Sequence, residues 1–538
     1  MSKKHTGSYY TPFYLAEFIS NRVLTYFEDT QPLNILEPSV GDGVFINAIQ
    51  KNQSFKKSLI EIVALDINGQ ELLKAKNNWG EETSSFIKID FLDYCPQKKF
   101  SLIIGNPPYI RKNRLDALQL NKCKAIHSSE SLSIASVKNI WTSFVVKSSS
   151  LLKDNGMLAF ILPLELLQVK FTEEIRDFLQ TKFQRLEIFT FNDLMFECKG
   201  QDTLILIAYK KASRKGVFYT NIESESQLRN NKFALKQNKA LVSSKVKWTH
   251  HLLNSEEIEF LEGLKRKLNS IDHYCASKAG IVTAANDYFI INSKTEKQYC
   301  LSKYTKPIIK KGSYVNGSVV FDETEYKELV NSNLPSKLIV FKDNDKENLS
   351  QTVNKYLKIG EEQNLPSRYK CIRRNNWFVI PHNTKQSAGF FFKRCHLYPR
   401  LLKNAANVFV TDSAYQIDMR EGFDINSLIC SFYNSLTLTF AELTGRYYGG
   451  GVLELTPNEF KSLPVPYLKI TDDTFEEYRK EFQNKKGIDT ILEANDFKVL
   501  NTVMGLTEEE ISKIQHLRVV LMNKRLKSSS VISISETN

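Results

Sequence analysis

The stretch Phe100-Ser101-Leu102-Ile103-Ile104-Gly105-Asn106-Pro107-Pro108-Tyr109 decides how the N-terminal part of this 538-residue chain folds. Its first six residues form an apolar run that predicts a buried strand. The prolines cannot extend that strand, because neither has a backbone N–H and each fixes its own φ angle. The residue before each proline is also driven toward extended geometry. We therefore expect a stiff elbow at the strand end, where an amide oxygen, a backbone carbonyl and an aromatic ring can grip a planar amino group such as that of a nucleobase.

On both sides of this elbow, short apolar runs alternate with helical patterns over residues 34–210. Strands are predicted at 34–36, 59–66, 86–90, 100–105, 156–163, 186–191 and 203–209, and helices at 44–51, 70–77, 141–152 and 172–181. Such alternation predicts an α/β fold with a mainly parallel, doubly wound sheet. Ligands of such sheets bind at the carboxyl ends of the strands, near the point where the strand order reverses.

Three earlier strand ends carry residues suited to a nucleoside-like ligand. Residues 33–45 read as strand, turn and helix, and Gly41 and Gly43 let the backbone approach a ligand closely. No complete G-x-G-x-x-G or G-x-x-x-x-G-K-[ST] sequence is present, which disfavours dinucleotide and nucleoside triphosphate sites. The next strand ends in Asp66, which can accept ribose hydroxyls, and the third in Asp90-Phe91, which can accept an adenine amino group and cover the ring. An acid at one such position is more often a helix cap or a solvated loop residue, but the series at successive strand ends favours binding.

The composition is that of a globular protein with a basic surface. The formal net charge is +13 and the pI is about 9.0, which favours a polyanionic partner. There is no run of eighteen apolar residues, and the start has no apolar signal core, so we expect a cytoplasmic location. The eight cysteines form no C-x-x-C pair and the histidines form no H-E-x-x-H pattern, so neither a metal site nor a disulfide framework is expected.

The character of the chain changes after about residue 240. Basic residues then alternate with aromatic ones, which favours a nucleic-acid surface, although half-buried strands give the same pattern. The basic residues are Lys303, Lys306, Lys310, Lys311, Arg368, Lys370, Arg373, Arg374, Lys393, Arg394, Arg400 and Lys403, and the aromatic ones include Tyr304, Tyr314, Tyr369, Trp377, Phe390, Phe391, Phe392 and Tyr398. From about residue 470 the pattern is helical, and Thr507 and Glu510 predict a capping box that opens a helix to about residue 527. The Ser-rich residues 528–538 are predicted to be disordered. We expect domains at 1–240, 241–470 and 471–538.

The order of these motifs resembles that of the gamma-class N6-adenine DNA methyltransferases of the N-P-P-Y type, which include type II restriction-modification methylases. In that family a Y-[FY]-T-P segment precedes the glycine motif, and here it is Tyr9-Tyr10-Thr11-Pro12. The glycine motif, the ribose acid, the D-F pair and N-P-P-Y follow in family order, and residues 151–158 resemble the family's L-L-K-x-x-G stretch. A looser resemblance covers residues 280–287, 445–451 and 463–466. Ala284 stands where the family usually has glycine.

The resemblance implies a Rossmann-like methyltransferase sheet in residues 1–240, a mixed α+β target-recognition domain that binds DNA in 241–470, and a helical C-terminal region. It implies S-adenosylmethionine as cofactor, double-stranded DNA as partner, a separate cognate restriction endonuclease as a further partner, and methyl transfer to the N6 amino group of a flipped-out adenine. The cofactor residues it implies are Tyr10, Thr11, Pro12, Glu37, Pro38, Gly41, Gly43, Asp66, Ile67, Asp90, Phe91 and Asn106. The catalytic residues it implies are Asn106, Pro107, Pro108, Tyr109 and Phe196, with Asn106 and the Pro107 carbonyl on the target amino group and Tyr109 and Phe196 stacked on the base.

Three alternatives stay open at this point. An N-P-P-Y methyltransferase that acts on RNA or on a protein glutamine has the same elbow, but it is typically shorter and lacks both the Tyr-Thr-Pro start and a long basic C-terminal half. A non-catalytic DNA-recognition subunit would not need the intact elbow. In a fused restriction-modification enzyme the nuclease usually precedes the methyltransferase, whereas the cofactor motif here begins near residue 7.

Overall fold

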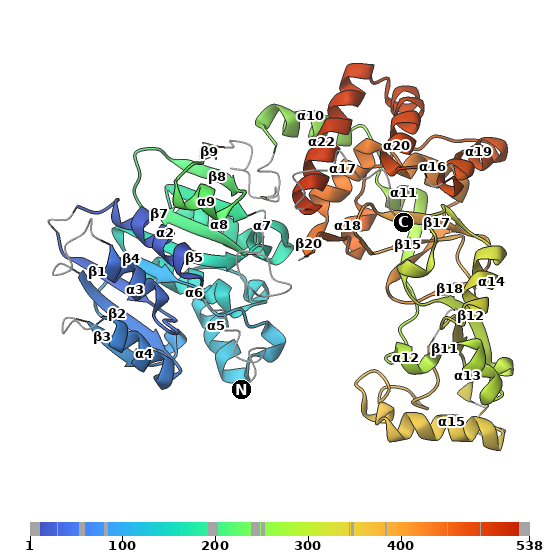
Figure 1. Cartoon of the computed structure of the whole chain (residues 1–538), viewed down its shortest axis with the longest axis horizontal. Helices are drawn as coiled ribbons and strands as arrows, with labels where there is room; N and C mark the ends of the chain where they lie inside the picture. Colours follow the sequence, from blue (N-terminus) through green and yellow to red (C-terminus); the bar gives the residue numbers. More distant parts are fainter. Residues whose placement is uncertain are drawn as a thin grey trace. The chain divides into compact units, whose positions relative to one another are not determined.

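The computed structural model describes residues 11–28, 31–52, 60–79, 84–191, 203–237, 248, 253–343, 345, 349–381, 385–448, 450–484 and 486–526. The chain divides into two compact units, residues 1–260 with 448–450, and residues 261–447 with 451–538 (Figure 1). The functional boundaries expected at residues 240 and 470 stay a prediction. Among the described residues, no helix is long and apolar enough to cross a membrane.

A nine-stranded sheet with the order β3-β2-β1-β4-β5-β7-β6-β8-β9 forms the centre of the first unit (Figure 1). Its strands are β1 (Leu33–Glu37), β2 (Ile60–Asp66), β3 (Ser85–Lys88), β4 (Phe100–Gly105), β5 (Leu152–Pro163), β6 (Arg185–Phe191), β7 (Thr203–Tyr209), β8 (Gly216–Ile222) and β9 (Lys236–Gln237). β1 to β5 are parallel, whereas β7 is antiparallel to both β5 and β6. The strand order reverses between β1 and β4, so the rule for α/β sheets places a ligand at the carboxyl ends of these two strands.

Helices cover both faces of this sheet, which confirms the doubly wound α/β fold. Within β4, Ile104 packs into one hydrophobic core with α2 (Phe13–Leu24), α3 (Val44–Lys51) and α4 (Gly69–Trp79). Its neighbour Ile103 packs into a second core with α5 (Ala117–Ser129), α6 (Ile140–Leu151) and α8 (Glu173–Lys182). Because successive strand residues face opposite sides, a strand covered on both faces reads as one continuous apolar run. That pattern made β4 recognisable.

The sequence pattern missed α5, and the structure shows why. Only Cys123 and His127 of this helix are buried among its thirteen residues. Two buried positions give no apolar stripe of helical period, so the signal on which the prediction depends is absent. The helix matters nonetheless, because its Gln119 lines the cavity described below.

The second unit combines three small sheets with helices, which agrees with the expected mixed α+β architecture. The largest has the order β10-β19-β15-β17-β13, and the others have the orders β11-β14-β12-β18 and β16-β21-β20. The strands are β10 (Cys275–Ala279), β11 (Ile290–Ile291), β12 (Thr305–Ile309), β13 (Val320–Phe321), β14 (Lys337–Ile339), β15 (Gly389–Phe392), β16 (Arg394–Cys395), β17 (Arg400–Asn404), β18 (Phe409–Val410), β19 (Ala414–Met419), β20 (Arg446–Tyr448) and β21 (Val452–Glu454).

The C-terminal helices pack onto this unit through a buried ion pair. The predicted capping box is present, since Thr507 N–H donates to Glu510 Oε2 at 3.0 Å and Glu510 N–H donates to Thr507 Oγ1 at 3.2 Å, at the start of α22 (Glu508–Leu526). Near the other end of α22, Arg525 binds both oxygens of Glu442 in α17 (Ser435–Thr444) at 2.8 Å. Their side chains are 0% and 4% exposed. The predicted tail, residues 528–538, lies outside the described residues.

The aromatic residues of the second unit divide between core and surface. Phe390, Phe391 and Phe392 of β15 are buried, so for them the half-buried strand was the right interpretation. Tyr369, in contrast, is 67% exposed.

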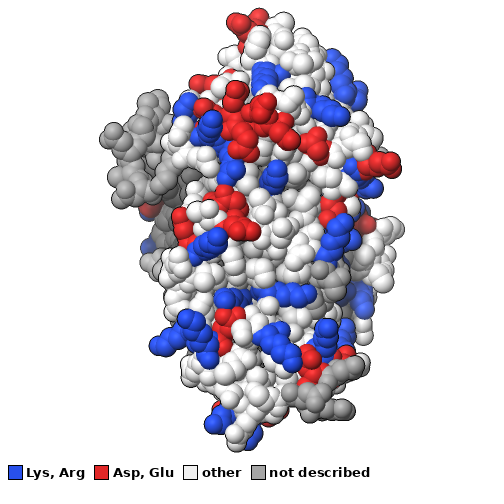
Figure 2. Space-filling view, turned by 90° about the vertical axis from the view of Figure 1, so that its right-hand side faces the viewer, with Lys and Arg blue, Asp and Glu red and all other residues white. Residues whose placement is uncertain are grey.

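The distribution of charge on the surface is uneven. Figure 2 shows one face of the molecule with acidic side chains gathered in its upper part and Lys and Arg predominant in its lower part.

Candidate active site

The elbow after β4 holds the Asn106 side chain at both ends. Asn106 Oδ1 accepts the Tyr109 hydroxyl at 2.9 Å, and Asn106 Nδ2 donates to Thr11 Oγ1 at 3.2 Å. The same Tyr109 hydroxyl lies 3.1 Å from the carbonyl oxygen of Ile161 in β5. Ser39 Oγ donates to the Asn106 carbonyl at 3.2 Å. The amide is therefore oriented, with its acceptor oxygen on a known side, before any ligand arrives.

The glycine loop after β1 is tied to the end of β2. Gly41 N–H donates to Asp66 Oδ2 at 2.9 Å, and the other oxygen of Asp66 accepts Asn68 N–H at 2.7 Å. Gly43 has φ 82° and caps α3, and a Cβ there would lie 2.8 Å from Ala75 Cα in α4. Glycine is thus required at this position both for the left-handed backbone and for the close approach of two helices.

A cavity of about 720 Å³ opens where the strand order reverses. This volume lies within the range of small-molecule and cofactor sites. Its lining comes from the carboxyl ends of β1, β2 and β4, the end of β3, the first turns of α3, α4 and α6, and Gln119 of α5. The lining residues are Thr11, Glu37, Pro38, Ser39, Val40, Gly41, Asp42, Val44, Phe45, Asp66, Ile67, Asn68, Gly69, Glu71, Lys88, Ile89, Asp90, Phe91, Asn106, Pro108, Ile110, Gln119, Ile140 and Phe144.

The charged residues that line the cavity are mainly acids, and one oxygen of the most buried acid has no hydrogen-bond partner among the described residues. Glu37 is 2% exposed, and no described residue makes a hydrogen bond with its Oε2 atom. Burial, followed by the charges of Asp42 and Asp66, raises the pKa of the Glu37 carboxyl well above its usual range. Burial and then the charge of Glu71 also raise the pKa of Asp42. A positively charged ligand group would pair with this Glu37 oxygen and offset the free-energy cost of ionising the buried carboxyl.

The rest of the cavity suits an apolar ring and a sugar. Ile67 is 66% exposed next to Asp66 and lines the cavity, so it offers an apolar surface to a ring. Phe91 is buried against Phe144, with ring centroids 4.7 Å apart. Asp90 does act as a cap, since its Oδ1 accepts Leu92 N–H at 2.9 Å, while it also lines the cavity. The acceptor oxygens and apolar side chains of the lining therefore fit an adenosyl group that carries positive charge.

The structure places most of the predicted site residues around this cavity. Of the others, Pro12 precedes α2 as its cap, and Pro107 is buried within the elbow. Tyr109 is 7% exposed, so in this structure its ring is largely covered, and its stacking role stays a prediction. Tyr10 and Phe196 lie outside the described residues.

Several lining residues escaped the sequence reasoning. Ser39 and Asp42 lie inside the glycine loop, where their position next to Gly41 could have indicated them. Gln119, Ile140 and Phe144 come from α5 and α6, and no motif marks them. Only the packing of these helices against the sheet brings them to the cavity.

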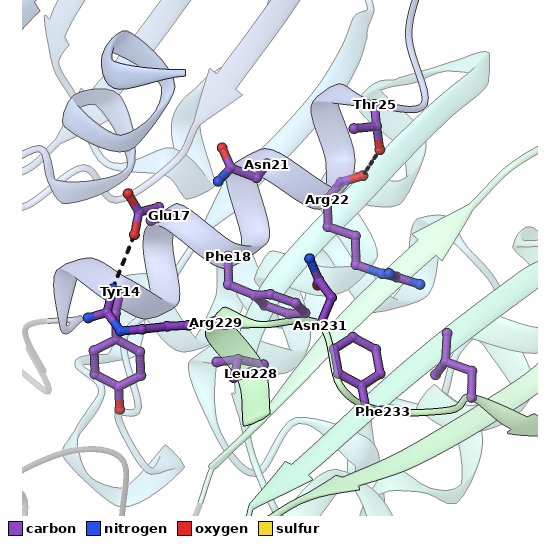
Figure 3. Close-up of a pocket in the computed structure, with 11 residues that line it drawn as sticks. Tyr14, Glu17, Phe18, Asn21, Arg22, Thr25, Leu228, Arg229, Asn231 and Phe233 are labelled. Carbon is purple, nitrogen blue, oxygen red and sulfur yellow. Dashed lines mark hydrogen bonds and ion pairs between the residues drawn. The ribbon is translucent and has the colours of Figure 1, made fainter. Parts of the chain in front are cut away.

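A separate cavity of about 560 Å³ lies between α2 and the chain around α9 (Glu225–Arg229), and Figure 3 shows its lining. Its arginines are already paired, Arg22 with Glu187 at 2.7 Å and Arg229 with Glu17 at 3.4 Å. None of the predicted site residues lines it. We regard it as a structural groove.

Comparison with known families agrees with the arrangement around the larger cavity. Residues 22–196 match the family described as "Eco57I restriction-modification methylase", and residues 245–500 match "Type II methyltransferase M.Eco57I, C-terminal domain". The chain is 23% identical to the type II methyltransferase M.AccI of Acinetobacter calcoaceticus over 537 residues, which cover 96% of this chain and 95% of that protein. The chain belongs to the type II restriction-modification methylases.

Two further likenesses of this methylase concern parts of the chain or its fold. The methylase is 32% identical over 177 residues to M.CvrRI of Paramecium bursaria Chlorella virus XZ-6E, covering 32% of this chain and 40% of that protein. Its fold is similar to that of the type IIL restriction-modification enzyme MmeI, solved in complex with DNA, with a TM-score of 0.59, 12% identity and coverage of 95% of this chain and 76% of the other.

As a type II methylase, the protein is a DNA methyltransferase of a restriction-modification system, and S-adenosylmethionine is its methyl donor. The acid-lined cavity is where its residues fit this cofactor. Within the described ranges, no group of three or more His, Cys, Asp and Glu side chains could hold a metal ion.

Proposed function

We propose that this methylase transfers a methyl group to the exocyclic N6 amino group of adenine in double-stranded DNA. The observation that carries the proposal is the Asn106-Pro107-Pro108-Tyr109 elbow at the mouth of the acid-lined cavity. Asn106 Oδ1 accepts the Tyr109 hydroxyl at 2.9 Å, so the elbow holds the amide oxygen in a defined direction.

The chemistry needs a nucleophile that adenine does not readily supply. The lone pair of its amino nitrogen is delocalised into the ring, so the nitrogen is a poor nucleophile. Two fixed acceptors, Asn106 Oδ1 and the Pro107 carbonyl, favour a tetrahedral nitrogen by holding both N–H bonds. Bound S-adenosylmethionine supplies an electrophilic methyl group. The contribution of the protein is positioning and electrostatic stabilisation, and no covalent intermediate with the enzyme is required.

The proposal includes base flipping, because the amino group of a paired adenine is not accessible in a duplex. We assign Tyr109 and Phe196 to the two faces of the flipped base. We assign the cofactor contacts to Tyr10, Thr11, Pro12, Glu37, Pro38, Gly41, Gly43, Asp66, Ile67, Asp90, Phe91 and Asn106.

The remaining parts of the proposal concern organisation and partners. Residues 1–240 carry catalysis, and residues 241–470 select the target sequence, since a long basic C-terminal half has no role in the methyl transfer itself. A separate restriction endonuclease cuts the same sequence when it is unmodified. The name of the matched family, a restriction-modification methylase, supports this pairing.

Nucleoside analysis of modified DNA tests the proposal. DNA lacking modified bases is incubated with the full chain and S-adenosylmethionine, digested to nucleosides and analysed by mass spectrometry, and a second portion is sequenced for modified bases. N6-methyladenine within one short sequence is the expected product, and Asn106→Ala should form it about 10²–10³ times more slowly. N4-methylcytosine or 5-methylcytosine as the product would overturn the adenine assignment.

A further inference from the structure

One outward-facing segment of the second unit is strongly basic. Residues 363–377, called here the basic segment, contain four cations (Arg368, Lys370, Arg373 and Arg374) and no Asp or Glu. The segment follows α15 (Gln351–Glu362) and lies beside α12 (Asn286–Phe289) (Figure 1). Neither the cofactor cavity nor a buried strand explains this basic cluster.

The backbone of the basic segment is wound into consecutive turns that present its side chains selectively. Cys371 N–H and Ile372 N–H both donate to the Arg368 carbonyl, at 2.8 and 3.0 Å. Cys371 is 1% exposed and faces the core, whereas Tyr369 and Ile372 are 67% and 66% exposed. The turns therefore present an aromatic and an aliphatic side chain to solvent among the cations.

Two of the four cations hold the segment in place. Arg368 Nη1 donates to the Ala284 carbonyl at 2.9 Å, and Arg374 Nη2 donates to the Thr283 carbonyl at 2.9 Å. Arg374 also donates to the Trp377 carbonyl at 3.0 Å. These bonds fix the basic segment to the loop before α12, where Ala284 has φ 70°. A cavity of about 540 Å³ lies between the basic segment and this loop.

The other two cations have no such structural use. Neither Lys370 nor Arg373 forms an ion pair with any residue that the structure describes. The guanidinium carbon of Arg373 lies 4.0 Å from the ring centroid of Tyr369. This cation–π contact orders the guanidinium in advance, so less side-chain entropy is lost when it binds.

We propose that the basic segment is a contact to duplex DNA, in which Arg373 reads base edges and Lys370 binds a phosphate. A stacked arginine presents the bidentate donor pair that guanine accepts, and Tyr369 and Ile372 offer apolar contact to bases, such as a thymine methyl group. Lysine binds phosphates without reading sequence. The inference rests on the proposed role of the second unit in selecting the target, and it assigns that role to named residues.

Binding of short duplexes to single variants tests the inference. The wild-type recognition sequence is determined first, and affinities are then measured over a salt series for a duplex with this sequence and for a scrambled one. Arg373→Ala should weaken binding to the recognition duplex about 5- to 150-fold and to the scrambled duplex much less. Lys370→Ala should weaken binding to both equally and lower the salt slope by about one. Arg373→Lys should keep the slope and lose the preference.

The matched control is Lys327→Ala, whose side chain in α14 (Glu323–Asn331) is 74% exposed and pairs with Glu323. It should change neither affinity nor slope. Calorimetry with S-adenosylmethionine checks that each variant is folded, and Tyr369→Ala provides a second variant that removes the stacking partner. If Arg373→Ala and Lys370→Ala bind and methylate the recognition duplex as the wild type does, the inference is wrong. Failure of the proposed function is seen separately, because the wild-type chain itself would then yield no N6-methyladenine.

Discussion

Replacement of Glu37 by Gln should change both the strength and the pH dependence of cofactor binding. The Glu37 carboxyl is buried, has an oxygen without a partner among the described residues and has a raised pKa because of burial and the nearby Asp42 and Asp66. In the free protein the Glu37 carboxyl is therefore mostly protonated at pH values below this raised pKa. The positively charged ammonium or sulfonium group of S-adenosylmethionine favours the carboxylate instead. Binding should then release a proton.

The loss of this proton on binding sets how far the affinity for the cofactor should change with pH. While Glu37 is protonated in the free protein and ionised in the complex, affinity should rise about tenfold per pH unit, and it should level off above the raised pKa. Glu37→Gln removes the charge but keeps the shape, so its affinity should be flat with pH. Above the pKa the variant should bind more weakly by about 1.5–3 kcal/mol, the contribution of a hydrogen bond to a charged group, or about 10- to 150-fold. Below it the two proteins should converge.

Isothermal titration calorimetry between pH 5.5 and 8.5, in buffers of different ionisation enthalpy, measures both the affinity and the number of protons released. Glu61→Gln, which removes an exposed carboxylate from β2, serves as the control and should match the wild type. The reasoning is refuted if the wild type releases no proton and Glu37→Gln binds the cofactor with unchanged affinity at high pH. In that case Glu37 does not face the charged part of the cofactor.

Three further outcomes are expected. Asn106→Ala should lower the rate of methyl transfer by about 10²–10³ even at saturating cofactor and DNA, and Tyr109→Phe should lower it less; single-turnover kinetics with labelled cofactor separates rate from binding. Burial lowers the pKa of His127 to about 4, so the unfolded chain takes up a proton at a higher pH than the folded protein does. The free energy of unfolding should therefore fall by up to about 3 kcal/mol as the pH drops from 6.5 to 4. In urea unfolding, His127→Gln should show a flatter pH dependence than the wild type, and an unchanged dependence would contradict this. Arg525→Met should destabilise the protein by about 3–5 kcal/mol because it leaves Glu442 as a buried unpaired charge, and Arg525→Met combined with Glu442→Leu should recover much of that loss in thermal unfolding.

The hydrogen bond between Asn106 and Thr11 connects two motifs that are far apart in the sequence. Its distance is 3.2 Å, and Thr11 is 8% exposed in the wall of the cofactor cavity. The amide that we propose to bind the target is therefore hydrogen-bonded to a residue of the cavity wall.

The sequence by itself determined seven of the nine strands of the sheet, with β8 and β9 missed, and where along the chain the candidate site residues lie. The apolar runs of β1, β2 and β4 are local patterns, and Asp66, Asp90 and Asn106 follow strands directly, so their meeting at one edge follows from parallel strand direction alone. The elbow was equally predictable, because the constraint that each proline places on φ does not depend on the rest of the fold.

Only the tertiary structure decided how individual side chains are used. Arg373 and Arg374 are neighbours in the sequence, yet Arg374 is bonded to the Thr283 carbonyl while Arg373 lies on the exposed ring of Tyr369. The isolation of the Glu37 oxygen likewise depends on packing by distant elements. Composition and periodicity report whether a segment is apolar on one face. They do not report a hydrogen-bond partner 91 residues away, such as the Thr283 carbonyl that Arg374 binds, because such a partner leaves no local pattern in the sequence.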